Sequence, residues 1–210
     1  VGYAALDANT TGAQNIAIGY AALGQSNGDA NTALGYNTLQ ANTTGQYNTA
    51  LGGNALEANT TASSNVAIGK NALLSNTTGA NNVAVGAFSL DANTTGDDNV
   101  AIGRDALTAC TASDNVAVGN YALDACTTGA SNAAVGRHAL GAVTTGGYNV
   151  AVGGLAGDAI TTGEGNVAIG RQSLSDNTTS SYNTAVGYLA LKANTAGNNT
   201  AVGYNAMFAN

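Results

Sequence analysis

A segment of 17 residues that recurs along the chain decides the fold. Residues 65–81 read NVAIGKNALLSNTTGAN, and variants of this segment fill the sequence from end to end. The glycine after the aliphatic triplet, here Gly69, returns every 16 or 17 residues, and we call it the reference glycine of each repeat. The reference glycines are Gly2, Gly19, Gly35, Gly52, Gly69, Gly86, Gly103, Gly119, Gly136, Gly153, Gly170, Gly187 and Gly203. A fixed short period of this kind indicates a repeat architecture.

Most positions of the repeat accept a narrow set of residues. Asn always stands four positions before the reference glycine, Ala two before, and Val, Ile or Leu one before. Ala, Ser or Thr stands three positions after it, and Leu stands four after, except at Gly157 and Met207. Thr fills the eighth position after it, except at Asn27. Such uniform columns predict that equivalent residues of successive repeats lie against one another.

The repeat has the residues of short strands joined by turns. The alternating, β-branched triplet before the glycine is typical of a strand, and we expect a second short strand around the Ala-Leu pair. The Asn-Thr-Thr-Gly stretch supplies turn residues. Two strands and two turns make one coil of a parallel β-solenoid, in which equivalent residues lie about 4.8 Å apart. The sequence therefore predicts an all-β solenoid of about twelve coils of 16–17 residues, with the Asn column forming an amide ladder.

Residues 1–210 are expected to form a single repeat array, an uncapped segment of a longer repetitive protein or filament.

The invariant Ala faces the side of the strand opposite to its aliphatic neighbours, and a fixed small residue indicates a backbone packed closely against it. Both faces of the strand are therefore expected to be buried. Since one thin coil buries one face, the pattern predicts lateral self-association, most simply a homotrimer.

Composition excludes several classes of function. The net charge is −7, with 5 basic and 12 acidic residues, so the clustered cations that nucleic acids require are missing. No apolar run is long enough for membrane insertion. The single histidine, His138, leaves no nucleophile pair or metal set. We expect no enzyme, no metal and no cofactor, and we interpret an acidic stripe in the fifth position after the glycine as a solvated edge. Its members are Asp7, Glu57, Asp91, Asp124 and Asp158.

A candidate contact ridge lies in the position directly after the reference glycine. Tyr and cationic residues gather there, and both are enriched at contact surfaces. The ridge residues are Tyr3, Tyr20, Tyr36, Lys70, Arg104, Arg137, Arg171, Tyr188 and Tyr204. The alternative is that these long side chains merely cover a corner of the coil.

Two further sets of residues have both a chemical and a structural interpretation. Asn-Thr-Thr sequons predict glycosylation on a surface turn, or else a buried Asn column, which we favour. They begin at Asn9, Asn42, Asn59, Asn76, Asn93 and Asn177. Cys110 and Cys126 occupy the same column in adjacent repeats, close enough for a disulfide. Since Val143 and Ile160 continue that column, two buried thiols are the favoured alternative.

The NVAIG, NTALG and NTAVG cores, followed by Gly-x-x-Ala-Leu, resemble the YadA-like head repeats of trimeric autotransporter adhesins. Similar repeats occur in some phage tail-fibre proteins. The resemblance implies a left-handed, trimeric β-roll that is displayed outside the cell, on a cell or virion surface, and attaches to a glycan or protein. The alternative is a self-assembling extracellular filament of stacked coils. Ice binding through Thr ladders is a weaker hypothesis.

Overall fold

The computed structural model describes residues 1–209 and forms two compact units, Val1–Arg104 and Asp105–Asn210. Each unit is an all-β, parallel solenoid with six strands of three residues. The first unit contains β1 (Ile16–Ile18), β2 (Thr32–Leu34), β3 (Thr49–Leu51), β4 (Val66–Ile68), β5 (Val83–Val85) and β6 (Val100–Ile102). The second contains β7 (Val116–Val118), β8 (Ala133–Val135), β9 (Val150–Val152), β10 (Val167–Ile169), β11 (Thr184–Val186) and β12 (Thr200–Val202).

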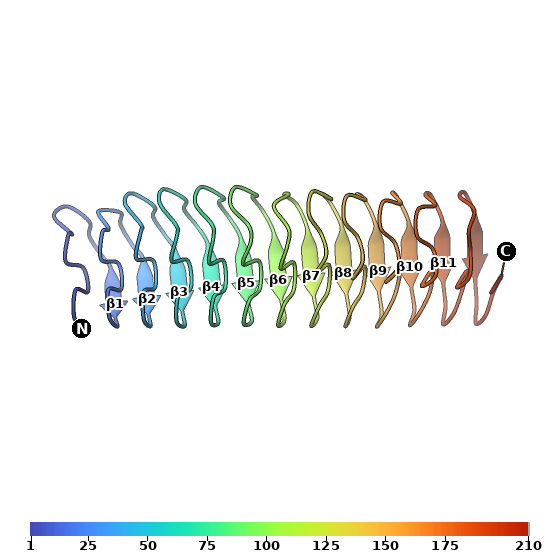
Figure 1. The fold of residues 1–210 in the computed structure, drawn as a ribbon, viewed down its shortest axis with the longest axis horizontal. Helices are drawn as coiled ribbons and strands as arrows, with labels where there is room; N and C mark the ends of the chain where they lie inside the picture. The colour runs from blue at the N-terminus through green and yellow to red at the C-terminus, as the bar shows by residue number, and fades with distance from the viewer. Residues whose placement is uncertain (210) are drawn as a thin grey trace. The chain divides into compact units, whose positions relative to one another are not determined.

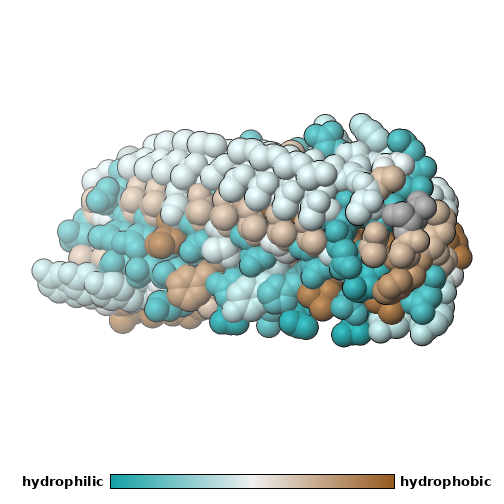
Figure 2. Space-filling model, turned by 45° about the vertical axis from the view of Figure 1, so that its right-hand side comes forward, coloured by the Kyte–Doolittle hydropathy of each residue, from teal (hydrophilic) through white to brown (hydrophobic). Residues whose placement is uncertain are grey.

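Within each unit, every strand pairs in parallel with the strand of the next coil, so the strands follow one another in chain order (Figure 1). The register places equivalent residues opposite one another: Ala50 pairs with Ala67, and Ala151 pairs with Ala168. Rows of residues with similar hydropathy therefore run from coil to coil (Figure 2). The predicted parallel β-solenoid is confirmed.

The interior of each coil is narrow. The central Ala of every strand is buried, whereas the residues on either side of it are half-buried or exposed. The buried Leu column and the small residues beside it complete the core. The single coil encloses the Ala face and leaves the aliphatic face outside, so the burial of both faces through lateral self-association stays a prediction.

The expected second strand is also absent from the described residues. A turn replaces it, in which the second and fourth positions after the reference glycine have a left-handed backbone, as at Asn54 (φ 60°) and Leu56 (φ 53°). Successive residues of a strand point to opposite faces, but both members of the pair Ala55-Leu56 are buried. The left-handed residues break the alternation and direct both side chains inward. Burial of a Leu side chain contributes about 1.5–3 kcal/mol, which offsets the cost of about 1–2 kcal/mol for a left-handed residue.

Hydroxyl groups at two positions of the repeat satisfy backbone carbonyls. Where the third position after the glycine is Ser or Thr, the hydroxyl donates to that glycine's carbonyl, as from Ser89 to Gly86 at 2.9 Å. The Thr at the eighth position donates to its counterpart's carbonyl in the next coil, as from Thr43 to Thr60 at 3.0 Å. These bonds explain why Thr recurs at the eighth position and why Ser or Thr can replace the common Ala at the third.

Candidate functional site

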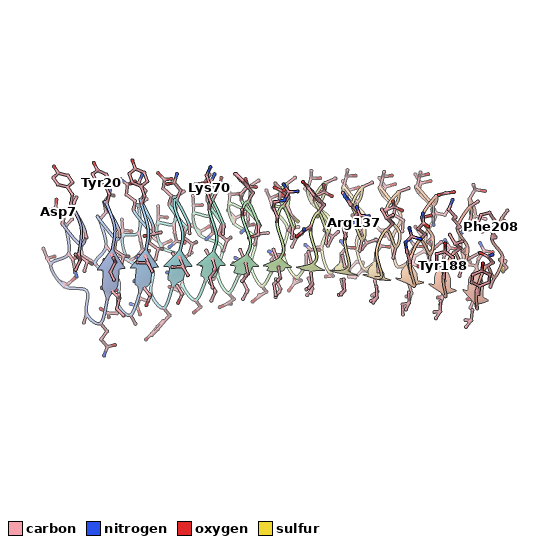
Figure 3. All side chains as sticks on the ribbon, turned by 90° about the horizontal axis from the view of Figure 1, so that it is seen from below. Asp7, Tyr20, Lys70, Arg137, Tyr188 and Phe208 are labelled. Carbon is pink, nitrogen blue, oxygen red and sulfur yellow. The ribbon has the colours of Figure 1, made fainter. Side chains whose placement is uncertain are left out.

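Three kinds of surface feature of this solenoid carry chemistry: the contact ridge, two hollows, and the aliphatic strand face. In the first unit, Tyr20 and Lys70 project from the side of the coil opposite to the strands (Figure 3). The position that carries them follows the reference glycine, whose φ of 123–144° ends the strand and turns the chain outward. All nine ridge residues are exposed.

The tyrosines of the ridge stack on one another. Tyr20 lies between Tyr3 and Tyr36, with ring centroids 5.4 and 5.2 Å apart and nearly parallel planes. Tyr188 and Tyr204 stack in the second unit at 5.7 Å. Stacking covers the inner ring faces, so the inner rings of such a column present edges and hydroxyl groups to the solvent. The ridge is therefore suited to hydrogen bonding more than to ring-face contacts.

The cations of the ridge never occupy adjacent coils. Lys70, Arg104, Arg137 and Arg171 occur in alternate coils, separated by Ala87, Asn120 and Gly154. Cations stacked in adjacent coils would lie about 4.8 Å apart and repel, whereas alternate coils double that distance. Lys70 lies over the Phe88 ring at 5.6 Å, and Arg171 over the Tyr188 ring at 5.9 Å. An aromatic ring thus holds one ridge cation in place in each unit.

A hollow of about 400 Å³ lies beside the ridge in the second unit. It forms where Gly141 replaces a side chain between Asp124 and Asp158, in the column of the acidic stripe, and His138 and Arg137 also line it. Burial raises the pKa of both aspartates above the usual value of 3.8. The Asp158 Oδ1 atom is buried and has no hydrogen-bond partner. These two carboxylates are thus half-buried members of the acidic stripe.

His138 is held flat against Tyr121, with ring centroids 4.9 Å apart and planes 5° from parallel. Its proximity acts against burial and lowers the pKa of Asp124 and Asp158. A second hollow of about 510 Å³ lies in the first unit, and its polar lining residues are Gln25, Gln40, Glu57 and Ser75. Both hollows present side chains that can hydrogen-bond to a ligand.

The sequon asparagines point into the coil. Asn42, Asn59, Asn76, Asn93 and Asn177 are buried, and Asn9 is half-buried. In the first unit their amides form a ladder, as from Asn59 Nδ2 to Asn42 Oδ1 at 2.9 Å. Each amide also donates to a carbonyl in its own turn, as from Asn76 Nδ2 to Gly79 O at 2.9 Å. A glycan on the buried amides would require them to leave the folded coil, so the inward-facing interpretation fits this structure.

The aliphatic face of the strands is the strand surface that the single coil leaves uncovered. It consists of the first and third residue of each strand, which are Val, Ile, Leu, Thr or Ala without exception. Many of these side chains are exposed, including Ile102 at 40% in the first unit and Val135 at 41% in the second. The Thr residues in the first position, such as Thr49 and Thr184, were the available signal that this column faces outward.

Two searches for other kinds of site gave negative results within residues 1–209. No helix there has the length and apolar character needed to span a membrane. No group of three or more His, Cys, Asp or Glu side chains in that part of the chain is arranged to hold a metal ion.

The fold defines the chain as a parallel β-solenoid repeat protein. No protein-family model matches it, and comparison with curated proteins and with solved structures likewise gave no match. The resemblance to YadA-like head repeats accordingly rests on the repeat motif.

Proposed function

We propose that this chain is a non-enzymatic structural and adhesive rod, a left-handed β-roll that assembles as a homotrimer on a cell or virion surface. The observation that carries the proposal is the uncharged, exposed aliphatic face of both units. Exposed apolar patches larger than a few hundred Å² generally mark interaction sites. Since this face repeats coil after coil, it is suited to a long lateral contact.

A second copy of this chain is the partner that fits best. The residues of the face recur at the strand spacing of about 4.8 Å, so an identical chain in parallel presents the same residues with the same period. Ring closure by three copies would cover the face in every copy. The resemblance of the NVAIG cores to heads of trimeric adhesins supports the same number of copies.

The oligomeric state of the full chain tests this assembly. We expect a trimeric mass by light scattering after size-exclusion chromatography. The double variant Val150→Lys/Val167→Lys, with a charge on the face in two coils, should give a monomer with an unchanged circular dichroism spectrum. The matched control Thr145→Lys/Thr162→Lys places the same charges on exposed turn residues and should remain trimeric. A monomeric unmodified chain contradicts the proposal, and long unbranched fibres in electron micrographs favour a filament of stacked coils instead.

The attachment surface in this proposal is the contact ridge with the hollow at Gly141. The ridge is exposed, combines hydroxyl and guanidinium donors, and adjoins carboxylates that can accept hydrogen bonds. This combination fits a hydroxyl-rich ligand such as a glycan.

The triple variant Arg104→Ala/Arg137→Ala/Arg171→Ala is expected to lose most of the binding of the native chain to an array of immobilised glycans. Lys192→Ala removes a cation outside the ridge, where Lys192 pairs with Asp176 at 3.1 Å, and should leave binding unchanged. Unaltered binding by the triple variant would exclude the ridge as the attachment surface without affecting the trimer.

A further inference from the structure

The two cysteines of the chain meet inside the second unit. Cys110 and Cys126 lie in adjacent coils, both are fully buried, and their Sγ atoms are 2.9 Å apart. A disulfide has an S–S distance of about 2.05 Å, so bond formation requires the sulfur atoms to approach by less than an ångström. The column register brings together two residues that are 16 positions apart in the sequence.

The same column forms a polar link between coils in the first unit. There, Asn93 Nδ2 donates to Asn76 Oδ1 at 3.0 Å, and Asn76 Nδ2 donates to Asn59 Oδ1 at 3.1 Å. In the second unit, Val143 and Ile160 follow the two cysteines and provide no hydrogen-bonding group. The cysteines thus occupy the first two of four consecutive coils in which the Asn column is interrupted, and a covalent bond would link these two coils in place of the amide hydrogen bond.

We propose that Cys110 and Cys126 form an intramolecular disulfide between adjacent coils when the folding chain meets a disulfide oxidant, such as oxidised glutathione or a thiol–disulfide oxidoreductase. This modification is independent of the proposed attachment function. Because both thiols are fully buried in the folded coil, the oxidant reaches them during folding or during local opening of the two coils.

The surroundings of the two sulfur atoms differ. The Cys110 sulfur lies against the Cys126 sulfur and also accepts from the Asn115 Nδ2 group, at 3.6 Å. The hydrogen bond from Cys126 is the main cause that lowers the pKa of Cys110, and a backbone donor at Ala112 acts in the same direction against burial. The hydrogen bond to Cys110, together with burial, raises the pKa of Cys126. In the closed coil, Cys110 is therefore the thiol of the pair with the lower pKa.

The exchange is balanced in atoms and electrons. The thiolate of one cysteine attacks one sulfur of the oxidant, forming a mixed disulfide and releasing the first oxidant thiolate. The other cysteine then loses its proton and attacks the protein sulfur of the mixed disulfide, which releases the second oxidant thiolate. One S–S bond forms in the protein as the oxidant's S–S bond is reduced, and the two cysteine protons end on the two released thiols.

Refolding of the full chain in a glutathione redox buffer tests the proposal. After refolding, the chain is denatured, treated with a maleimide and weighed by mass spectrometry. We expect a product lighter by two hydrogen atoms with no maleimide attached, and a protease digest that contains a fragment joining Cys110 to Cys126. A sample reduced in denaturant should take up two maleimides.

The single variants Cys110→Ser and Cys126→Ser keep the fold testable, because Ser occupies the same column at Ser26. Each should retain one sulfur that is free or bound to glutathione, and neither should yield the linked fragment. Two free thiols in the refolded native chain, with a normal circular dichroism spectrum, would overturn the proposal. Disulfide-linked dimers through either cysteine would overturn it equally.

Discussion

The Oδ1 atom of Asn48 accepts two hydrogen bonds from Asn65 in the next coil, one from its backbone N at 3.0 Å and one from its Nδ2 at 3.3 Å. The Nδ2 of Asn65 also donates to Gly79 O at 3.0 Å. One amide thus joins the strand of the previous coil to the turn of the next. These three hydrogen bonds explain why Asn stands at this position in every repeat. Asp lacks the donor, and a longer amide would not fit the register.

Asn65→Asp is expected to destabilise the protein by about 3 kcal/mol at neutral pH, because a buried carboxylate would face two acceptor oxygens. Burial raises the pKa of the new carboxyl, so the folded state binds the proton more tightly than the unfolded chain. The loss should therefore shrink as the pH falls. Denaturant unfolding of the native chain and the variant at pH 7 and pH 4 measures the loss of stability at each pH. The neighbouring exposed substitution Asn81→Asp serves as the control, and equal behaviour of the two variants would contradict the role of the ladder.

Gly52 and Gly53 give a matched pair of alanine substitutions. A Cβ on Gly52 would lie 2.7 Å from Gly69 O, and its φ of 123° is strained for any other residue. A Cβ on Gly53 would meet nothing within 4 Å. We expect Gly52→Ala to cost about 3 kcal/mol or more, and Gly53→Ala to change stability by less than about 0.5 kcal/mol. Unfolding midpoints in denaturant compare the two directly, and similar values would exclude the close approach of the glycine columns.

Gly157 and Ile160 compensate for each other. Gly157 stands where most coils have a buried Leu, and a Cβ there would lie 3.0 Å from Ile160 Cδ1 and from Leu140 Cδ2. Ile160 stands where most coils have Asn. Gly157→Leu alone should cost about 1–3 kcal/mol through overpacking. Adding Ile160→Asn restores the common arrangement and should recover much of that loss. A double-mutant cycle measures the coupling, and additive effects would show that the two sites are independent.

The half-buried carboxylates of the hollow predict a pH dependence. Burial raises the pKa of Asp124 and Asp158 above 3.8, so between the ordinary and the raised pKa the folded state binds more protons than the unfolded chain. Their contribution to stability is therefore present at acid pH and is lost as the pH rises through that window. Asp158→Asn should slightly stabilise the protein at pH 7, and the difference should vanish below about pH 3.8. Asp7→Asn, at an exposed position of the same column, is the control. A stabilisation that persists at low pH would point to a cause other than ionisation.

The sequence by itself determined the coil. The period of the reference glycines, the triplet before them and the Asn-Thr-Thr-Gly turn are local patterns, and each predicts its structure without knowledge of distant contacts. The amide ladder could be predicted as well, since in-register stacking turns one repeated residue into a column. The meeting of the two cysteines could be predicted in the same way, because they occupy the same position in adjacent repeats.

The tertiary structure alone decided which face of each strand is enclosed and how the chain returns behind it. Hydrophobicity would place Val66 and Ile68 inside, yet the coil encloses Ala67. The reason is that the returning turn, with left-handed residues such as Asn71 and Leu73, directs two successive side chains inward and leaves room for a single methyl group opposite. That packing depends on the width of the closed coil, which no stretch of the repeat encodes locally, and it is what leaves the aliphatic face exposed on the surface.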